Sequence, residues 1–212
     1  MINDIHQRFW ENTDVDKNEI INLSGVHPLK ARNIYVYGSR VYRTNKKDSD
    51  FDIVLTAGSL LDHTEIKSDK YNIHVHTPDK FKEDLNNYLV YALECFYAPD
   101  WAKVQIKEPF ADFKINPNKL KQSILTQSAN TWHGAKYKFG TGDVLRALKT
   151  GFHAIKAVQF GIQILETGKI SDFSANNDLL IDIRGCEFYD WRPFKEKYLP
   201  LKIELEEKFK SL

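Results

Sequence analysis

The alternation of polar and apolar residues predicts a small β-sheet in the first half of the chain. Residues 34–37 form a β-branched and aromatic run that is typical of a short buried strand, and residues 50–55 form a second one. Residues 71–77 alternate strictly between the two kinds of side chain, which predicts a third strand. An edge strand is expected at residues 101–106. We therefore expect these strands to build one small mixed sheet.

Helical patterns surround the predicted strands. Residues 3–12 and 17–24 are expected to form short helices that lead into the first strand. A turn or a short helix is expected at residues 58–62. Pro78 then begins a helix in which apolar side chains recur at helical spacing as far as Phe96, so that one face packs on the sheet.

Beyond Pro117 the pattern is helical, from about residue 118 to Gly168. Apolar side chains at alternating steps of three and four predict an amphipathic helix of about six turns, which Gly168 ends as a left-handed cap. The stripe consists of Leu145, Leu148, Phe152, Ile155, Val158, Ile162 and Leu165. Two further helices are expected near residues 177–184 and 193–210.

The 212 residues suffice for one sizeable domain or for two small ones with cores of their own. The change of pattern after the sheet favours two parts. We expect residues 1–113 to carry the sheet with its flanking helices, and residues 114–212 to form a helical part. The predicted fold class is therefore α/β, of the α+β kind.

Composition narrows the functional classes only slightly. The net charge is +1 and 42% of the residues are hydrophobic, so that neither disorder nor an overall basic field is indicated. Cys95 and Cys186 have no neighbouring Cys or His cluster, which argues against a disulfide framework or a zinc site. The first residues lack the apolar core of a signal peptide, and no run approaches the ~18 apolar residues of a membrane helix. We expect a soluble cytoplasmic protein without a membrane partner.

Candidate chemistry begins where the first strand ends. Gly38 would let the backbone approach a ligand that a Cβ would push away. The amides and the hydroxyl around Gly38 and Ser39 are suited to hold a phosphate, and Arg40 or Arg43 could add positive charge. An ordinary turn is the alternative interpretation of the Gly-Ser pair.

Two carboxylates follow on the second strand. Asp50 and Asp52 are two residues apart, which places their side chains on the same face. Two such charges repel unless a cation lies between them, and Mg²⁺ prefers carboxylate and phosphate oxygens. A phosphate cradle beside a metal pair is the layout of phosphoryl or nucleotidyl transfer. A charged entry to a strand is the alternative interpretation.

Gly38-Ser39, a gap of ten residues and then Asp50-x-Asp52 resemble the signature of the DNA polymerase β-type nucleotidyltransferase superfamily. Its members move a nucleoside monophosphate from an NTP to a hydroxyl. The resemblance implies that the two aspartates hold Mg²⁺ or Mn²⁺. It also implies that the Gly-Ser pair grips the β and γ phosphates of the NTP, which is the substrate.

The helical half resembles the C-terminal region of predicted nucleotidyltransferases of this type, which include RNA-repair-associated members. The matching residues are Ser128, Trp132, Lys136, Lys149, His153, Lys156 and the segment 165–170. The resemblance implies that this half closes a nucleotide cleft, in which His153 and these lysines contact the nucleotide. Lys156 replaces an arginine of the family pattern and lacks its bidentate fork. Lys149, His153 and Lys156 share one helix face, for which a solvated surface is the alternative.

The third carboxylate of the superfamily has no counterpart at the expected position. The strand beside Asp50-x-Asp52 offers Asn72, His74 and His76, and an amide cannot replace the charge of a carboxylate. His74 is a candidate general base, or a ligand for a softer metal such as Mn²⁺. A polar residue on a solvated sheet face is the equal alternative, and Asp48 and Glu94 are other acids that folding could bring close.

We therefore predict a metal-dependent nucleotidyltransferase that moves an NMP from an NTP to an acceptor hydroxyl and releases pyrophosphate. The RNA-repair resemblance alone makes an RNA end the preferred acceptor. Two alternatives stay open. The acceptor could be a protein side chain (AMPylation), as in the minimal members of the superfamily that are paired with toxins. The missing third acid could also mark a module that binds NTP without turnover.

Overall fold

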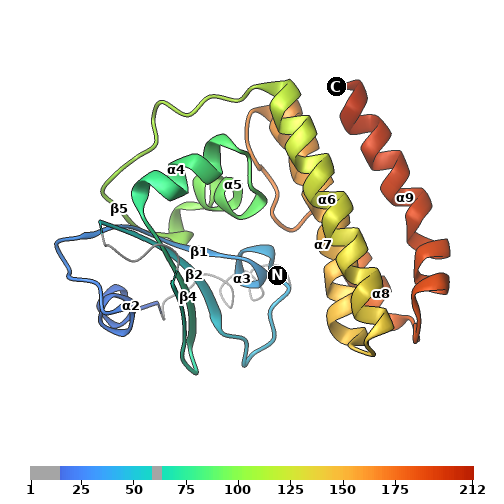
Figure 1. Ribbon diagram of the computed structural model, residues 1–212, viewed down its shortest axis with the longest axis horizontal. Coiled ribbons are helices and arrows are strands. Elements are labelled where there is room, and N and C mark those ends of the chain that lie inside the picture. Colours follow the sequence, from blue (N-terminus) through green and yellow to red (C-terminus); the bar gives the residue numbers. More distant parts are fainter. Residues whose placement is uncertain (1–14, 59–63) are drawn as a thin grey trace, which may run out of the picture. The chain divides into compact units, whose positions relative to one another are not determined.

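The computed structural model describes residues 15–58 and 64–212, and the chain divides into two compact units (Figure 1). The first unit consists of Met1–Asn86 with Tyr91–Phe113, and the second of Asn87–Val90 with Lys114–Leu212. The first unit is built on a β-sheet, and the second is built from helices. The mixture of a sheet with flanking helices confirms the predicted α+β class.

Five strands form one mixed sheet in the first unit, in the order β3-β4-β2-β1-β5. The strands are β1 (Ala31–Tyr37), β2 (Phe51–Ala57), β3 (Thr64–Lys67), β4 (Tyr71–His76) and β5 (Lys103–Ile106). β2 and β4 run parallel, and the other neighbouring pairs are antiparallel. All residues of β2 except Asp52 are buried, which suits the middle of a sheet. The four predicted strands are confirmed, but β2 begins after Asp50 and β3 was not predicted.

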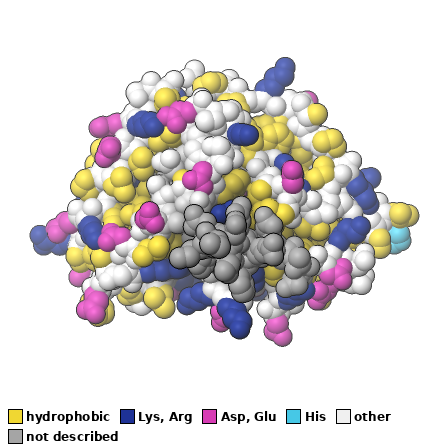
Figure 2. Space-filling view, turned by 180° about the vertical axis from the view of Figure 1, so that it is seen from behind, with side chains coloured by type: hydrophobic (Ala, Val, Ile, Leu, Met, Phe, Trp, Pro, Cys, Tyr) yellow, Lys and Arg dark blue, Asp and Glu magenta, His cyan; other side chains and the backbone are white. Residues whose placement is uncertain are grey.

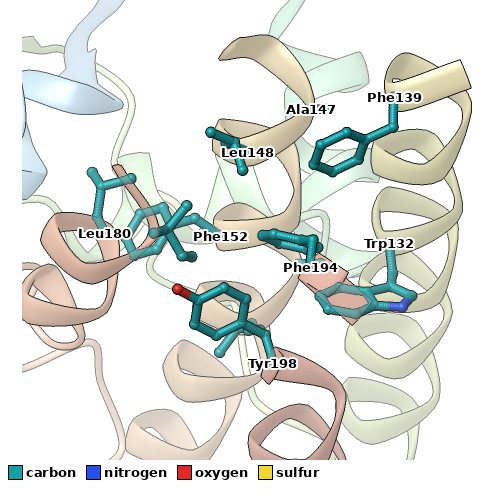
Figure 3. Close-up of a cluster of buried hydrophobic side chains, with 11 residues drawn as sticks. Trp132, Phe139, Ala147, Leu148, Phe152, Leu180, Phe194 and Tyr198 are labelled. Carbon is teal, nitrogen blue, oxygen red and sulfur yellow. The ribbon is translucent and has the colours of Figure 1, made fainter. Parts of the chain in front are cut away.

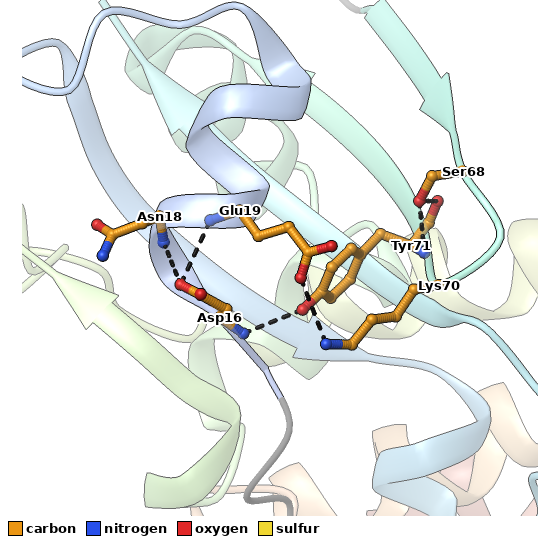
Figure 4. A network of polar contacts seen from close by, with 6 residues as sticks. All are labelled: Asp16, Asn18, Glu19, Ser68, Lys70 and Tyr71. Atoms are coloured by element: carbon orange, nitrogen blue, oxygen red, sulfur yellow. Dashed lines mark hydrogen bonds and ion pairs between the residues drawn. The ribbon is translucent and has the colours of Figure 1, made fainter.

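Helix α2 (Lys17–Ser24) is fixed to one face of the sheet by a small polar network (Figure 4). The carboxylate of Asp16 caps the helix by accepting hydrogen bonds from the amides of Asn18 and Glu19. The amide of Asp16 donates to the hydroxyl of Tyr71 on β4 at 3.0 Å, and Lys70 pairs with Glu19 at 3.3 Å. The predicted helix at residues 17–24 is thereby confirmed. The expected helix at residues 3–12 lies outside the described residues, as does most of the turn expected at residues 58–62.

Helices α4 (Pro78–Asn86) and α5 (Val90–Tyr97) follow β4, where the sequence predicted one continuous helix. The break lies at Tyr88, whose φ of 54° is left-handed. The side chain of Gln127 bonds to the backbone there, donating to the Tyr88 carbonyl at 2.9 Å and accepting from the Val90 amide at 3.0 Å. The prediction of one helix was wrong because a residue distant in the sequence satisfies the backbone at the break.

The two helices cover the sheet face opposite to α2 (Figure 1). The ring of Phe81 stacks on Tyr35 with centroids 5.6 Å apart, and the ring of Tyr91 stacks on His76 at 5.4 Å. His76 is therefore a buried residue and not part of a solvated face.

The second unit contains four helices in its described residues. They are α6 (Pro117–Gly140), α7 (Val144–Thr167), α8 (Asn177–Gly185) and α9 (Trp191–Ser211). The predicted long helix is α7, and Gly168 ends it with a φ of 79°, as expected. None of the helices in the described part of the chain is long and apolar enough to cross a membrane.

Aromatic side chains from three helices build the core of this unit (Figure 3). The ring of Phe194 on α9 lies 5.5 Å from Trp132 on α6 and 5.0 Å from Tyr198. Leu145 was predicted to join the apolar stripe, but its side chain is 83% exposed. The stripe is therefore buried from Leu148 to Ile162, and Leu165 at its end is half-buried.

Glycine has a specific packing role in α7. A Cβ on Gly151 would lie 2.4 Å from Cζ of Phe194, whose side chain is fully buried. We expect Gly151→Ala to destabilise the second unit, because overpacking costs about 1–3 kcal/mol and outweighs the roughly 1 kcal/mol of gained helix propensity. Urea denaturation measures the change in the free energy of unfolding.

Gly134→Ala in α6 is the matched control, since the nearest atom to a Cβ there would be Cγ2 of Thr150, at 3.8 Å. This variant should be stabilised by up to about 1 kcal/mol. Equal stability changes in the two variants would contradict the packing that the structure shows.

Candidate functional site

Gly38 joins β1 to the short helix α3 (Ser39–Tyr42), and its backbone has a conformation that is essentially restricted to glycine. Its φ is 73° and its ψ is −143°. A Cβ at this position would lie 2.7 Å from Oδ2 of Asp52. The backbone that the sequence assigned to phosphate binding therefore lies directly against a carboxylate of the predicted metal pair.

The two aspartates of the predicted metal pair have different surroundings. Asp52 lies on β2 between Tyr37 of β1 and Asn72 of β4. Its side chain is half-buried, and its Oδ1 accepts a hydrogen bond from Nδ2 of Asn72 at 3.4 Å. Asp50 precedes β2 and is exposed. One carboxylate is thus held by the sheet, and the other stands in solvent at the start of the strand.

The oxygen atoms around Asp52 fit a hard cation that arrives with a phosphate ligand. Within residues 15–58 and 64–212, no three His, Cys, Asp or Glu side chains form a group that could hold a metal. Asp50 and Asp52 offer carboxylate oxygens, and Oδ1 of Asn72 is buried with no hydrogen-bond partner in the described part of the chain. Mg²⁺ is usually bound by one or two carboxylates plus substrate phosphates, which this set allows.

Arg40 was predicted to contact a phosphate, and the structure places its guanidinium on the loop before β2. The guanidinium lies 3.6 Å from the ring centroid of Phe51. Its Nε donates to the carbonyl of Asp50 at 3.3 Å, and its Nη2 donates to the carbonyl of Ser49. Arg40 thus ties α3 to the start of β2. Arg43 is exposed and caps α3 with a φ of 62°.

His74 lies one alternation along β4 from Asn72, on the same sheet face as Asp52. Nδ2 of Asn72 lies 3.3 Å from Nε2 of His74. Because an amide nitrogen can only donate, Nε2 is the acceptor, and the neutral imidazole carries its proton on Nδ1. Asn72 therefore links the carboxylate of Asp52 to the proposed base.

Glu65 is a neighbour of the site that the sequence did not reveal. The antiparallel pairing of β3 with β4 places it opposite His74. The ammonium of Lys67, 3.0 Å away, lowers the pKa of Glu65, with smaller contributions from His74 and the amide of Asn72. The side chains of residues 64–67 alternate between half-buried and exposed, as is typical of a strand. Four residues are too few for such an alternation to be recognised in the sequence.

Four helical residues were predicted to contact the nucleotide, and the structure brings three of them, Lys149, His153 and Lys156, together on α7, whereas Lys136 lies elsewhere. Lys149 is exposed and His153 is half-buried on α7. Lys156 is fully buried, and its ammonium donates to the carbonyls of Phe173 and Ala175 at 2.8 and 2.9 Å. Lys156 therefore holds the segment between α7 and α8.

Lys136 faces α9, where it lines a pocket of about 480 Å³ together with Trp191 and Lys195. The lysine of α6 whose positive charge lowers the pKa of His153 is instead Lys138. Its ammonium also donates to the hydroxyl of Thr150 on α7 at 2.8 Å. Lys136 and Lys138 are two residues apart, so their side chains differ in direction by more than half a turn around the helix axis. The two lysines therefore point to different neighbours. Neither Lys138 nor Arg184, whose charge also lowers the pKa of His153, could be identified from the sequence.

The surface carries charges of both signs. On the face of the molecule shown in Figure 2, basic and acidic side chains are interspersed. This mixture agrees with the net charge of +1. Comparison of the sequence with known protein families and with curated proteins finds no match.

His153 should make the stability of the protein depend on pH. Burial, followed by the charges of Lys149, Lys156, Lys138 and Arg184, lowers its pKa from 6.5 to about 3. The folded protein thus keeps the imidazole neutral while the unfolded chain takes up a proton below about pH 6.5. The contribution of His153 to the free energy of unfolding should therefore be fully present above about pH 6.5. It should decrease as the pH falls, by up to about 1.4 kcal/mol per pH unit.

Urea denaturation at about pH 7.5 and about pH 5.5 measures this effect in the parent protein and in His153→Gln. We expect the difference between the two pH values to be smaller in the variant. His133→Gln is the control, because His133 is an exposed histidine on α6. The same pH dependence in all three proteins would show that His153 is not held neutral by the fold.

Proposed function

We propose that the first unit is the core of a metal-dependent nucleotidyltransferase, which moves an NMP from an NTP to an acceptor hydroxyl and releases pyrophosphate. The contact between the backbone of Gly38 and the carboxylate of Asp52 carries this proposal. Nucleotidyl transfer needs a phosphate-binding backbone directly beside metal-binding carboxylates. The close approach of the Gly38 backbone to the carboxylate of Asp52 supports the proposal.

In this proposal, each residue of the candidate site has its own role in binding the substrate or the metal. Gly38 and Ser39 bind the β and γ phosphates through backbone amides and the hydroxyl. Asp50 and Asp52 would hold Mg²⁺ or Mn²⁺, and the bound cation would neutralise charge on the phosphates. Arg40 keeps the loop before β2 in place through the carbonyls of Ser49 and Asp50. The spacing between the phosphate-binding turn and the carboxylates is thus set before a substrate binds.

His74 accepts the proton of the acceptor hydroxyl in this proposal. The only lone pair of the neutral ring is on Nε2, which accepts from the amide of Asn72, so this contact must open before Nε2 takes the proton. Glu65, opposite His74 in the sheet, supplies a negative charge that stabilises the protonated ring. The pair of Glu65 and His74 thereby takes over part of the role of the third carboxylate.

The helical unit contributes positive charge in this proposal. The family resemblance assigns nucleotide contacts to Lys136, Lys149, His153 and Lys156. Lys149 and His153 are the better supported of the four, because Lys149 is exposed and Lys138 adds a further charge near His153. Lys156 is the least supported, since its ammonium already donates to two backbone carbonyls.

On the basis of the family resemblance, we propose an RNA end as the acceptor. A protein side chain is the alternative acceptor if the protein is an enzyme of this class. A module that binds NTP without turnover is the second candidate function. Asn72 favours this candidate, because it places an uncharged amide beside Asp52 where a third carboxylate would be expected.

Transfer of label from each α-labelled NTP tests the proposal directly. The protein is incubated with Mg²⁺ or Mn²⁺ and a mixed pool of RNA and protein, beside Asp52→Asn. We expect label on RNA with the parent protein, and a loss of about a hundredfold or more with the variant, because metal coordination is worth several kcal/mol. Asp69→Asn, which changes an exposed aspartate in the same unit, should retain the activity.

Each other outcome has a defined meaning. Label on protein in place of RNA would change the acceptor and keep the chemistry. Binding of NTP without any transfer would establish the binding module. Equal transfer by the parent protein and Asp52→Asn would refute a role for Asp52 in the reaction.

A further inference from the structure

The conformation of Gly38 needs support from the residues around it. Its φ of 73° and ψ of −143° belong to a sparsely populated region that persists only when the surrounding structure holds it. The helix that follows, α3, has four residues, which is too short to be stable by itself. Whatever anchors α3 therefore also holds Gly38 against Asp52.

Tyr42 at the end of α3 is such an anchor. Its amide donates to the carbonyl of Gly38 at 3.0 Å, which closes the turn of α3 onto the glycine. Its side chain is 4% exposed, and its hydroxyl donates to Oε1 of Glu94 on α5. A continuous set of contacts thus runs from α5 through Tyr42 and Gly38 to Asp52.

The hydrogen bond between Tyr42 and Glu94 is buried on both sides. Glu94 is 4% exposed, and a buried carboxylate is costly unless a donor satisfies it. Burial and the charge of Glu94 raise the pKa of Tyr42 well above its usual value, so the phenol keeps its proton and remains a donor. The phenol of Tyr42 therefore remains the donor in this contact.

We propose that Tyr42 and Glu94 are positioning residues that hold the Gly38-Ser39 turn in the geometry that binds the NTP phosphates. This inference rests on the proposed function, and it adds two residues that do not touch the substrate. Their effect is transmitted through α3 to Gly38. It should therefore appear in the affinity for NTP more than in the rate at saturating NTP.

The same unit contains a matched pair for comparison. The hydroxyl of Tyr91 on α5 donates to the carboxylate of Asp84 on α4, and Asp84 is also 4% exposed. This pair has the same donor and acceptor groups and does not involve α3, but Tyr91 is half-buried and Asp84 also pairs with Lys80 at 2.9 Å. Tyr91→Phe therefore reports the loss of a tyrosine–carboxylate hydrogen bond in the same unit that does not anchor α3.

Calorimetric titration with Mg²⁺ and NTP compares the parent protein with Tyr42→Phe and Tyr91→Phe. We expect Tyr42→Phe to bind about three- to tenfold more weakly, as for the loss of one hydrogen bond, and Tyr91→Phe to bind like the parent. Label transfer should show a raised KM with little change in kcat for Tyr42→Phe. Glu94→Gln keeps an oxygen acceptor and should bind more tightly than Glu94→Leu.

Hydrogen exchange of residues 38–44 decides the inference without any need for nucleotide binding. Exchange there should be faster in Tyr42→Phe than in the parent protein and unchanged in Tyr91→Phe. If the parent protein binds no NTP but exchange changes as expected, the proposed function fails and the anchoring of Gly38 stands. Unchanged exchange in Tyr42→Phe, or equal affinities in both tyrosine variants, would overturn the inference.

Discussion

The contact between the Gly38 backbone and the Asp52 carboxylate is the constraint on which the candidate site depends. It needs a residue without a Cβ, because any other side chain would collide with Oδ2 of Asp52. It also needs the antiparallel register that places Tyr37 opposite Asp52. The close approach of Gly38 to Asp52 thus fixes the pairing of β1 with β2, the turn at Gly38 and the carboxylate relative to one another. The proposed phosphate and metal chemistry rests on that geometry.

The side chains around this contact are held by the protein itself. Arg40 binds the carbonyls before β2, and Asn72 joins Asp52 to His74. Tyr42 connects α3 to Glu94. Groups that are fixed before a ligand binds lose less entropy on binding, which favours affinity. The uncharged amide of Asn72 argues against turnover, because a third carboxylate would be expected at its position. In the proposed mechanism, Glu65 and His74 compensate for that missing carboxylate.

Much of the fold follows from local pattern, and its errors have identifiable physical causes. β1 was predictable because residues 34–37 are a continuous β-branched and aromatic run, and α7 because its apolar stripe recurs along the whole helix. β3 was missed because its four residues include one apolar side chain, Ile66. The break at Tyr88 was missed because Gln127, distant in the sequence, supplies the hydrogen bonds that make the break tolerable.

The sequence by itself determined the chemistry that is available at the candidate site. The glycine, the two aspartates and their spacing follow from residue type and strand alternation, which are local properties. The tertiary structure decided which long side chains could take part. It turned Lys156 toward two backbone carbonyls, brought Lys138 toward His153 in place of Lys136, and set Glu65 opposite His74. The partner of a flexible charged side chain depends on neighbours from other elements, and those are defined only when the chain is folded.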